Sequence, residues 1–234
     1  GDQTLGATGQ QSSYALETID VLLPTNQKSM VLPLVEGLPP DQLLQRLQPY
    51  FPQQSRSPEA WLPEVILCSE VWLTSWVKAA ALYTIARLPA PHLTPLVISS
   101  LESTDPLMRE SALWTLNQLD PAQTRVKSDH MGDDPSPEVA AMARQLTNAH
   151  KGDRLMLSTV EKVMALKRLS IFNDTPNEVL ADVAVVFNEQ KVGAGETIFE
   201  KGEIGNSVYI LTEGEVHIHD GENTIARLTE NDVF

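Results

Sequence analysis

Two histidines near the carboxyl end of the sequence have the spacing of metal ligands. His217 and His219 stand at positions i and i+2 of an alternating segment, so on a β-strand both imidazoles would point to one face. Asp220 follows them, and imidazole with carboxylate is a common ligand set for metals. The same alternation also fits a solvent-facing strand with Val216 and Ile218 turned inward. We favour this second interpretation and predict no metal site.

No other residues have the spacing of a catalytic site. Cys68 is the single cysteine, and because no basic residue stands near it in the sequence, we expect it to be a core residue. Gly193-Ala-Gly195 is too short for a dinucleotide fingerprint and precedes a predicted strand. The carboxylates are not grouped with a basic or nucleophilic motif that would make an acid–base pair. We therefore predict that the chain is not an enzyme and carries no cofactor of its own.

The four tryptophans could form an aromatic surface in the amino-terminal part of the chain. Helical spacing places most of them in the core, but tryptophan is also a frequent energetic anchor of protein interfaces. Trp72 and Trp76 are four residues apart and would lie on one face of a helix. We name Trp72 and Trp76 as candidate protein-interface residues.

Composition and charge limit the class of protein and its partners. The chain has 234 residues, of which 42% are hydrophobic and 21% charged, so it can bury a core. A formal net charge of −14 argues against nucleic acid, since phosphates need clustered Lys and Arg. The longest uncharged stretch, residues 88–101, contains three prolines and is shorter than the ~20 apolar residues of a transmembrane helix. We expect a protein partner and no insertion of this chain into a bilayer.

The distribution of proline and glycine divides the chain near residue 150. Fifteen of the 16 prolines lie at or before Pro137, and seven of the 12 glycines lie at or after Gly152. Residues 120–137 have the composition of a surface loop, and residues 150–153 form a second break. Residues 1–57 read as short helices interrupted by prolines, with Asp41 as an N-cap. We expect this first segment to be a divergent helical cap or repeat.

Two helical segments before the break form an internal repeat. Residues 76–88 and 107–119 match at a shift of 31 positions, and a weaker third copy includes Pro137, Val139 and Ala143. An amphipathic stretch precedes each of the two stronger copies, which indicates helix pairs that bury their apolar faces against one another. The segment Asp105-Pro-Leu-Met-Arg109, followed by Ala-Leu, resembles HEAT-type repeats. This resemblance predicts an all-α HEAT-like solenoid over residues 58–149; the alternative is an unrelated helical bundle.

After residue 150 two amphipathic helices precede a run of short strands. The helices are expected at residues 155–169 and, with Thr175 as the N-cap of the second helix, from there to about residue 187. Alternating patterns then predict strands at residues 197–199, 207–211, 215–219 and 224–228. Glycines separate these strands at positions where tight turns need positive φ: Gly195, Gly202, Gly205, Gly214 and Gly221. Short strands with regularly spaced glycines close into a roll.

The glycine-punctuated strands resemble a known binding fold. Gly195-Glu-Thr-Ile-Phe-Glu-Lys-Gly202, the run from Gly205 to Gly214, and Asn231-Asp-Val-Phe234 are similar to the cyclic nucleotide-binding domain. In that family a helix N-terminus and an arginine that follow the last strand hold the cyclic phosphate, and we expect them to lie beyond Phe234. The resemblance implies a nucleotide-site scaffold made of Gly195, Gly202, Gly205, Gly214 and Phe234. It also implies a domain over residues 150–234 that is truncated before its phosphate-binding cassette, and nucleotide binding in the complete protein.

A third resemblance concerns the whole protein. The segments at residues 15–23 and 155–162 are similar to the soluble carboxyl-terminal region of bacterial, notably cyanobacterial, membrane proteins related to ATP/ADP nucleotide transporters. The first residue is Gly1, which we take as the start of a fragment whose parent carries a membrane region upstream.

These observations predict an α+β multidomain chain with a helical solenoid followed by helices and an incomplete β-roll. Its expected role is regulation and protein docking at the cytoplasmic face of a membrane. Two alternatives remain: the regulatory region of a cyclic-nucleotide-controlled enzyme, and a structural subunit with no ligand.

Overall fold

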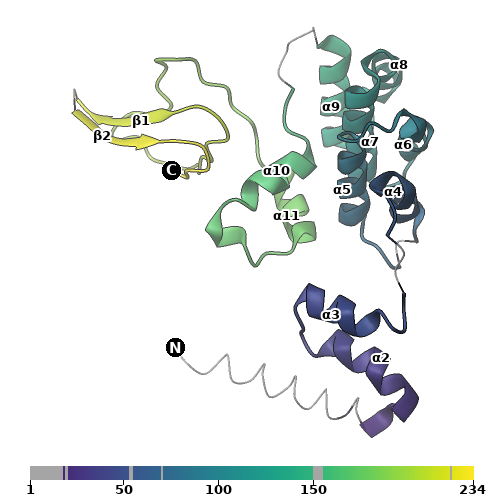
Figure 1. Cartoon of the computed structure of the whole chain (residues 1–234). Helices are drawn as coiled ribbons and strands as arrows, with labels where there is room; N and C mark the ends of the chain where they lie inside the picture. The colour runs from purple at the N-terminus through teal and green to yellow at the C-terminus, as the bar shows by residue number, and fades with distance from the viewer. Residues whose placement is uncertain (1–17, 19–20, 53–54, 70, 150–154, 222) are drawn as a thin grey trace, which may run out of the picture. The chain divides into compact units, whose positions relative to one another are not determined.

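The computed structural model describes residues 18, 21–52, 55–69, 71–149, 155–221 and 223–234. The described residues form ten α-helices and one small two-stranded sheet near the carboxyl end (Figure 1). The chain divides into two compact units, Gly1–Arg56 and Ser57–Phe234. The break expected at residues 150–153 lies outside the described residues.

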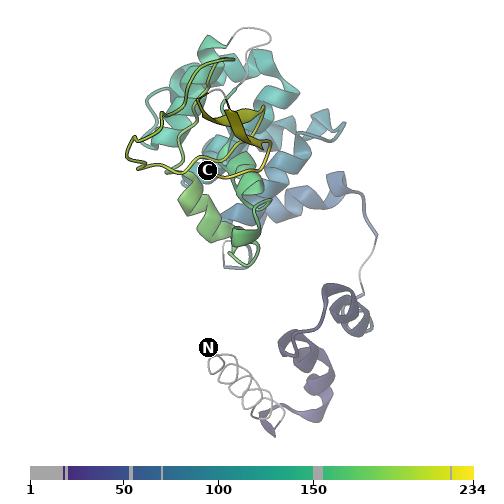
Figure 2. The same ribbon diagram turned by 90° about the vertical axis from the view of Figure 1, so that its left-hand side faces the viewer.

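The first unit contains a pair of helices, α2 (Thr25–Val35) and α3 (Pro40–Leu47), which lie side by side in both views (Figure 1 and Figure 2). Helix α3 begins one residue before Asp41, so the prediction of Asp41 as its N-cap is wrong. Proline at the first helical position already has the required φ, which explains the earlier start. Asp41 lies instead in the first turn, where its charge interacts favourably with the helix dipole.

Six α-helices build the first part of the second unit. They are α4 (Pro58–Leu67), α5 (Ser75–Ile85), α6 (Thr94–Ser100), α7 (Pro106–Leu119), α8 (Pro121–Met131) and α9 (Pro137–Asn148), with a 3-10 turn at Pro91–Leu93 before α6. Helices α4, α6 and α8 contact the helices that follow them, and α7 packs against both α5 and α9. The starts of α5, α7 and α9 are 31 residues apart, the spacing of the repeat in the sequence.

The residue before each of these three helices is a side chain of the N-capping type. The carboxylate of Asp105 accepts from the Leu107 amide at 2.8 Å, and the Ser136 hydroxyl accepts from the Val139 amide at 3.5 Å. Thr74 holds the equivalent position before α5, but its hydroxyl donates to Glu178 at 2.9 Å instead. The first of the three helices is therefore tied to the carboxyl-terminal part of the unit.

The surface loop predicted over residues 120–137 is wrong, because most of this segment is helix α8. Asp120 caps the helix by accepting from the Gln123 amide at 3.0 Å, and proline occupies the first position. The side chains that α8 buries are the small polar residues Thr124 and Ser128, one turn apart and both 0% exposed. A helix that turns hydroxyls inward has no apolar periodicity in its sequence, which is why the pattern indicated a loop.

The core of the helical part is a continuous apolar cluster that extends into the two helices after residue 155, where it includes Val163 and Leu180. Its fully buried members include small residues on α7 and α9, Ala112 and Ala143, beside large aliphatic residues such as Leu82, Leu113 and Leu116. Small side chains at these positions let neighbouring helices approach closely while the large ones fill the space between them.

We predict that Ala112→Arg destabilises the chain by about 3 to 5 kcal/mol, because it places an unpaired charge in the packed core. Ala141 lies on α9 and is exposed, so Ala141→Arg should change the free energy of unfolding by less than about 0.5 kcal/mol. Urea unfolding followed by circular dichroism compares the two variants. Equal unfolding midpoints would contradict the packing of α7 in the core.

A shielded ion pair joins the first turn of α7 to the segment that precedes α9. The Arg109 guanidinium donates to both carboxylate oxygens of Asp134 at 2.8 and 2.7 Å, and its third nitrogen donates to the carbonyls of Ser103 and Thr104. The two charged side chains are 12% and 9% exposed. The hydrogen bonds from Arg109 hold the pKa of Asp134 below its usual value, and those to Asp134 raise the pKa of Arg109.

We predict that Asp134→Ala costs about 3 kcal/mol of unfolding free energy, because Arg109 is left shielded from water without its partner. The neighbouring Asp133 is fully exposed, and its contact with Arg144 is 3.7 Å long. Asp133→Ala should therefore cost less than about 0.5 kcal/mol.

The same pair predicts a pH dependence with a definite sign. Because the pKa of Asp134 is lowered on folding, its contribution is complete above the unfolded value of about 3.9 and is lost as pH falls through the lower folded value. Wild type should lose more stability than Asp134→Asn when pH is reduced from 5 to 2. Parallel stability profiles for the two proteins would contradict this role of the pair.

Candidate functional site

The carboxyl-terminal part of the second unit begins with helices α10 (Thr159–Leu166) and α11 (Asn177–Ala184), separated by a 3-10 turn at Ser170–Phe172. The first helix starts four residues later than predicted, because Ser158 and Glu161 form a capping box at its N-terminus. The second starts after Pro176, so Thr175 is not its N-cap as predicted.

The sheet is a single hairpin of β1 (Val216–Asp220) and β2 (Asn223–Leu228), paired antiparallel (Figure 1). Val216 and Ile218 are half-buried, whereas His217 and His219 are exposed, as the alternation predicts. The His217 ring bonds to the Glu215 carboxylate, which also accepts from Arg227 at 3.0 Å. No group of three metal-ligating side chains occurs among the residues that the structure describes.

The other two predicted strands are not formed as predicted. Residues 197–199 make no strand, and within residues 207–211 only a short pairing with the chain end is present. There Tyr209 exchanges backbone hydrogen bonds with Phe234 at 2.8 and 3.0 Å, and the Leu211 amide donates to Asp232 at 2.9 Å. Most of residues 197–209 are exposed, so this segment has no packed sheet face to hold it extended. The roll is therefore partial.

An aromatic cluster that the sequence analysis missed connects the parts of this roll. Phe199, Tyr209 and Phe234 have ring centroids 5.3 to 6.2 Å apart, with Tyr209 stacked on Phe234. Phe234, a predicted nucleotide-site residue, is thus a packing partner of the other two rings. The sequence signal for this cluster was one aromatic residue in each of three segments that the resemblance places in the same roll.

The predicted scaffold glycines differ in what their backbone requires. Gly195, Gly202 and Gly214 have φ of +82°, +96° and +93°, a region that other residues rarely adopt. Gly205 does not have positive φ, and a Cβ there would meet nothing within 4 Å. The turn geometry predicted for Gly205 is therefore wrong, while a nucleotide-scaffold role for all of these residues stays a prediction.

The electrostatics of residues 189–234 disfavour an anion. This segment contains ten acidic and three basic residues. Lys201 binds Asp220 at 2.7 Å, Arg227 binds Glu215 at 3.0 Å, and Lys191 also has a partner. Each cation of the segment is already engaged by its own chain.

Four consecutive backbone amides connect the helical part to this segment. The amides of residues 156–159 donate in turn to the side chains of Gln145 (3.0 Å), Glu189 (2.6 Å), Glu161 (2.9 Å) and Glu110 (2.9 Å). Gln145 and Glu110 belong to α9 and α7, whereas Glu189 follows α11. The extended residues before α10 are thus held from both sides by side-chain oxygens. We call this set of four bonds the amide clamp.

Glu110 is the buried member of the amide clamp. Its side chain is on α7, the residue is only 5% exposed, and its carboxylate faces the N-terminus of α10. Burial raises the pKa of Glu110, against the smaller opposing effects of hydrogen bonds from Thr159 and the charge of Lys162. The Lys162 ammonium itself donates to the Phe187 carbonyl at 3.0 Å.

We predict that the contribution of Glu110 to the free energy of unfolding decreases as pH rises. A folded pKa above the unfolded value means that the folded state binds the proton more tightly, so stability declines from about pH 4 upward through the folded pKa. Glu110→Gln keeps an oxygen acceptor for Thr159 and should remove this decline above about pH 4. The exposed Glu102 provides the control, since Glu102→Gln should retain it. An unchanged slope in Glu110→Gln would contradict the prediction.

The candidate interface tryptophans lie in different environments. Trp76 is on α5 and only 9% exposed, so it belongs to the core. Trp72 precedes α5, in a turn, and is 80% exposed. The prediction that both lie on one helix face is therefore wrong, because the helix starts at Ser75. Cys68 is half-buried at the end of α4 and is not a core residue as predicted.

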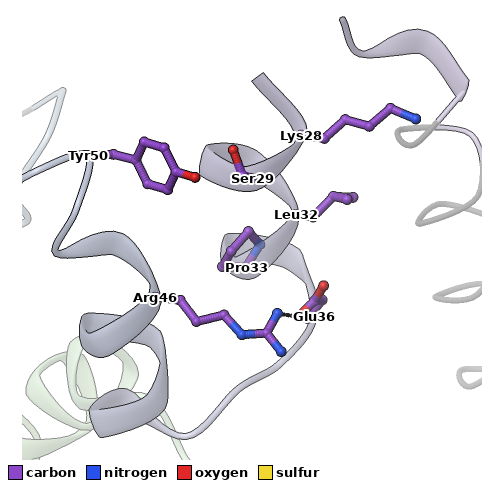
Figure 3. Close-up of a pocket in the computed structure, with 7 residues that line it drawn as sticks. All are labelled: Lys28, Ser29, Leu32, Pro33, Glu36, Arg46 and Tyr50. Atoms are coloured by element: carbon purple, nitrogen blue, oxygen red, sulfur yellow. Dashed lines mark hydrogen bonds and ion pairs between the residues drawn. The ribbon is translucent and has the colours of Figure 1, made fainter. Parts of the chain in front are cut away.

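The first unit contains an open depression of about 250 Å³ between α2 and α3 (Figure 3). Arg46 on its wall is bound to Glu36 at 2.8 Å, so the guanidinium is engaged within the wall. The remaining lining residues are Lys28, Ser29, Leu32, Pro33 and Tyr50. None of the residues predicted from the sequence lines this depression.

The comparisons with known proteins identify the carboxyl-terminal segment. Residues 189–234 match the family model described as cyclic nucleotide-binding domain. This confirms the resemblance for that segment, which contains the partial roll; residues 155–188 lie outside the match. No curated protein and no solved structure matches the chain. Neither HEAT repeats nor a nucleotide transporter is among the matches.

Proposed function

We propose that the chain is a non-enzymatic regulatory module in which a cyclic nucleotide-binding-type segment acts on a helical docking region. The match over residues 189–234 carries this proposal. The amide clamp supports it, because Glu189 at the start of the matched segment and Glu110 of α7 hold neighbouring amides. A change in the position of the matched segment would alter the hydrogen bond from Leu157 to Glu189, and through the neighbouring amide of Thr159 it would alter the contact of α10 with α7.

The described residues of this chain are poorly suited to bind a cyclic phosphate. Phosphate recognition needs a cation or a helix N-terminus that is free to face the anion. The cations of residues 189–234 are engaged with the chain's own groups, and acidic residues outnumber them ten to three. Nucleotide sensing by the native protein therefore depends on groups outside the matched segment.

For helices α4 to α9 we propose a HEAT-like stack that docks a protein. Support comes from the 31-residue spacing of helix starts and from the contacts of α7 with both α5 and α9. Stacked helix pairs present an extended surface, and such surfaces bind protein segments. An unrelated helical bundle would have no reason to repeat its capping positions at a constant interval.

The location that we propose is the cytoplasmic face of a membrane, in a larger assembly. The resemblance of residues 15–23 and 155–162 to transporter-related membrane proteins motivates it. Among the described residues, no helix has the length and apolarity needed to cross a bilayer. The net charge of −14 disfavours direct binding to anionic lipid, so a protein contact or a covalently attached membrane region is the proposed means of attachment.

We predict that the 234-residue chain binds cyclic AMP and cyclic GMP with dissociation constants weaker than about 1 mM, which corresponds to a binding free energy smaller than about 4 kcal/mol. Isothermal titration calorimetry measures both ligands. The control is the same titration with a variant extended by the helix and arginine that hold the phosphate in the cyclic nucleotide-binding family, which should bind one of the two in the micromolar range. Micromolar binding by the 234-residue chain would contradict the electrostatic argument, and no binding by the extended variant would contradict nucleotide sensing.

A further inference from the structure

A corner between α4 and α5 presents three large apolar side chains to solvent. Leu67 ends α4, and Val71 and Trp72 lie in the turn that follows; their exposed fractions are 73%, 84% and 80%. We call these three residues the Trp72 corner. Contiguous exposed apolar side chains on a soluble unit are typical of interaction sites.

The turn that carries Val71 and Trp72 is internally hydrogen-bonded. The amides of Trp72 and Leu73 donate to the Ser69 carbonyl at 3.0 and 3.2 Å, and the Val71 amide donates to the Ser69 hydroxyl at 3.4 Å. These bonds connect the described residues on either side of the corner, and the indole of Trp72 is 80% exposed beside them.

The other tryptophans do not share this position. Trp76 and Trp114 are 9% and 7% exposed, and Trp114 stacks on Tyr83 with a centroid distance of 4.5 Å. Trp61 is 39% exposed. Trp72 is the tryptophan whose large apolar surface is mostly unburied within this chain.

The surroundings of the corner are acidic, which identifies the chemistry of its partner. Residues 57–77 contain three glutamates and residues 169–190 four acidic residues. Of the basic residues that flank these segments, Lys78 is buried and the Lys167 ammonium donates to the backbone carbonyls of Phe172, Asn173 and Thr175. The hydrogen bond from Thr74 to Glu178 brings these two segments together two residues from Trp72. An apolar anchor with a negative surround is complementary to an apolar side chain flanked by positive charges.

We propose that the Trp72 corner docks a basic amphipathic segment of another protein, one that buries an aliphatic side chain against Trp72 and places Lys or Arg beside Glu178. This inference deepens the docking role of the proposed function and rests on it. Nucleic acid and anionic lipid carry the wrong charge for this surface. A second copy of the chain is disfavoured by its own net charge of −14.

The test uses the full 234-residue chain and a defined probe, a synthetic helical peptide of leucines and lysines in amphipathic order. Its matched control has every lysine replaced by glutamate. Fluorescence anisotropy of the labelled peptides should give binding only for the basic one, weakened by added salt. Trp72→Ala should weaken binding at least tenfold, and Trp72→Phe should restore most of it.

Two controls make the outcome specific. Because Trp72 is mostly exposed, Trp72→Ala should leave the circular dichroism spectrum and melting temperature unchanged, so that a loss of binding is a loss of contact. Ile204 is 95% exposed and lies in the acidic carboxyl-terminal segment, and Ile204→Ala should bind as wild type does.

Three results would overturn the proposal: equal binding of the acidic peptide, unchanged affinity in Trp72→Ala, or Trp72-dependent self-association in analytical ultracentrifugation. None of these would affect nucleotide binding by the native protein, so failure of the corner and failure of the sensing role remain distinguishable.

Discussion

The backbone amides of residues 156–159 need hydrogen-bond acceptors, and side chains from several parts of the second unit supply them. Extended backbone between two helical regions must find acceptors for its N–H groups, and here four side-chain oxygens supply them. Because two of the acceptors lie on α7 and α9 and a third, Glu189, is the first residue of the matched segment, the bonds that satisfy the backbone also join the two parts of the unit. Together with the apolar packing of α10 against α5 and α7, these bonds position α10 and the segment that follows it.

Glu110 makes that junction sensitive to its surroundings. A carboxylate that is 5% exposed gives up much of its hydration, and the N-terminus of α10 returns only part of that free energy. The Arg109–Asp134 pair differs from Glu110, because each of its two shielded charges has an oppositely charged partner. Arg109 also donates to a nearby backbone carbonyl. Burial therefore raises the pKa of Glu110, whereas hydrogen bonds from Arg109 lower the pKa of Asp134.

The sequence predicted features that depend on local chemistry. The 31-residue interval, the outward histidines of β1 and the positive φ of Gly195, Gly202 and Gly214 follow from residue type and spacing alone. Helix α8 was missed because its buried side chains are hydroxyls. The amide clamp was missed because its acceptors are up to 49 positions away in sequence, where no periodicity connects them. Trp72 was predicted on the same helix as Trp76 because a four-residue interval in the sequence does not show that a helix begins between the two residues, as α5 does at Ser75.

The amide proton of Thr159 tests the account most directly. At the first position of α10 this amide has no acceptor within its own helix, so in isolation it would exchange with solvent freely. If Glu110 of α7 holds it, hydrogen exchange measured by NMR should give strong protection of Thr159 in wild type and rapid exchange in Glu110→Ala. Rapid exchange of Thr159 in wild type, or protection that survives in Glu110→Ala, would contradict a unit joined through this bond.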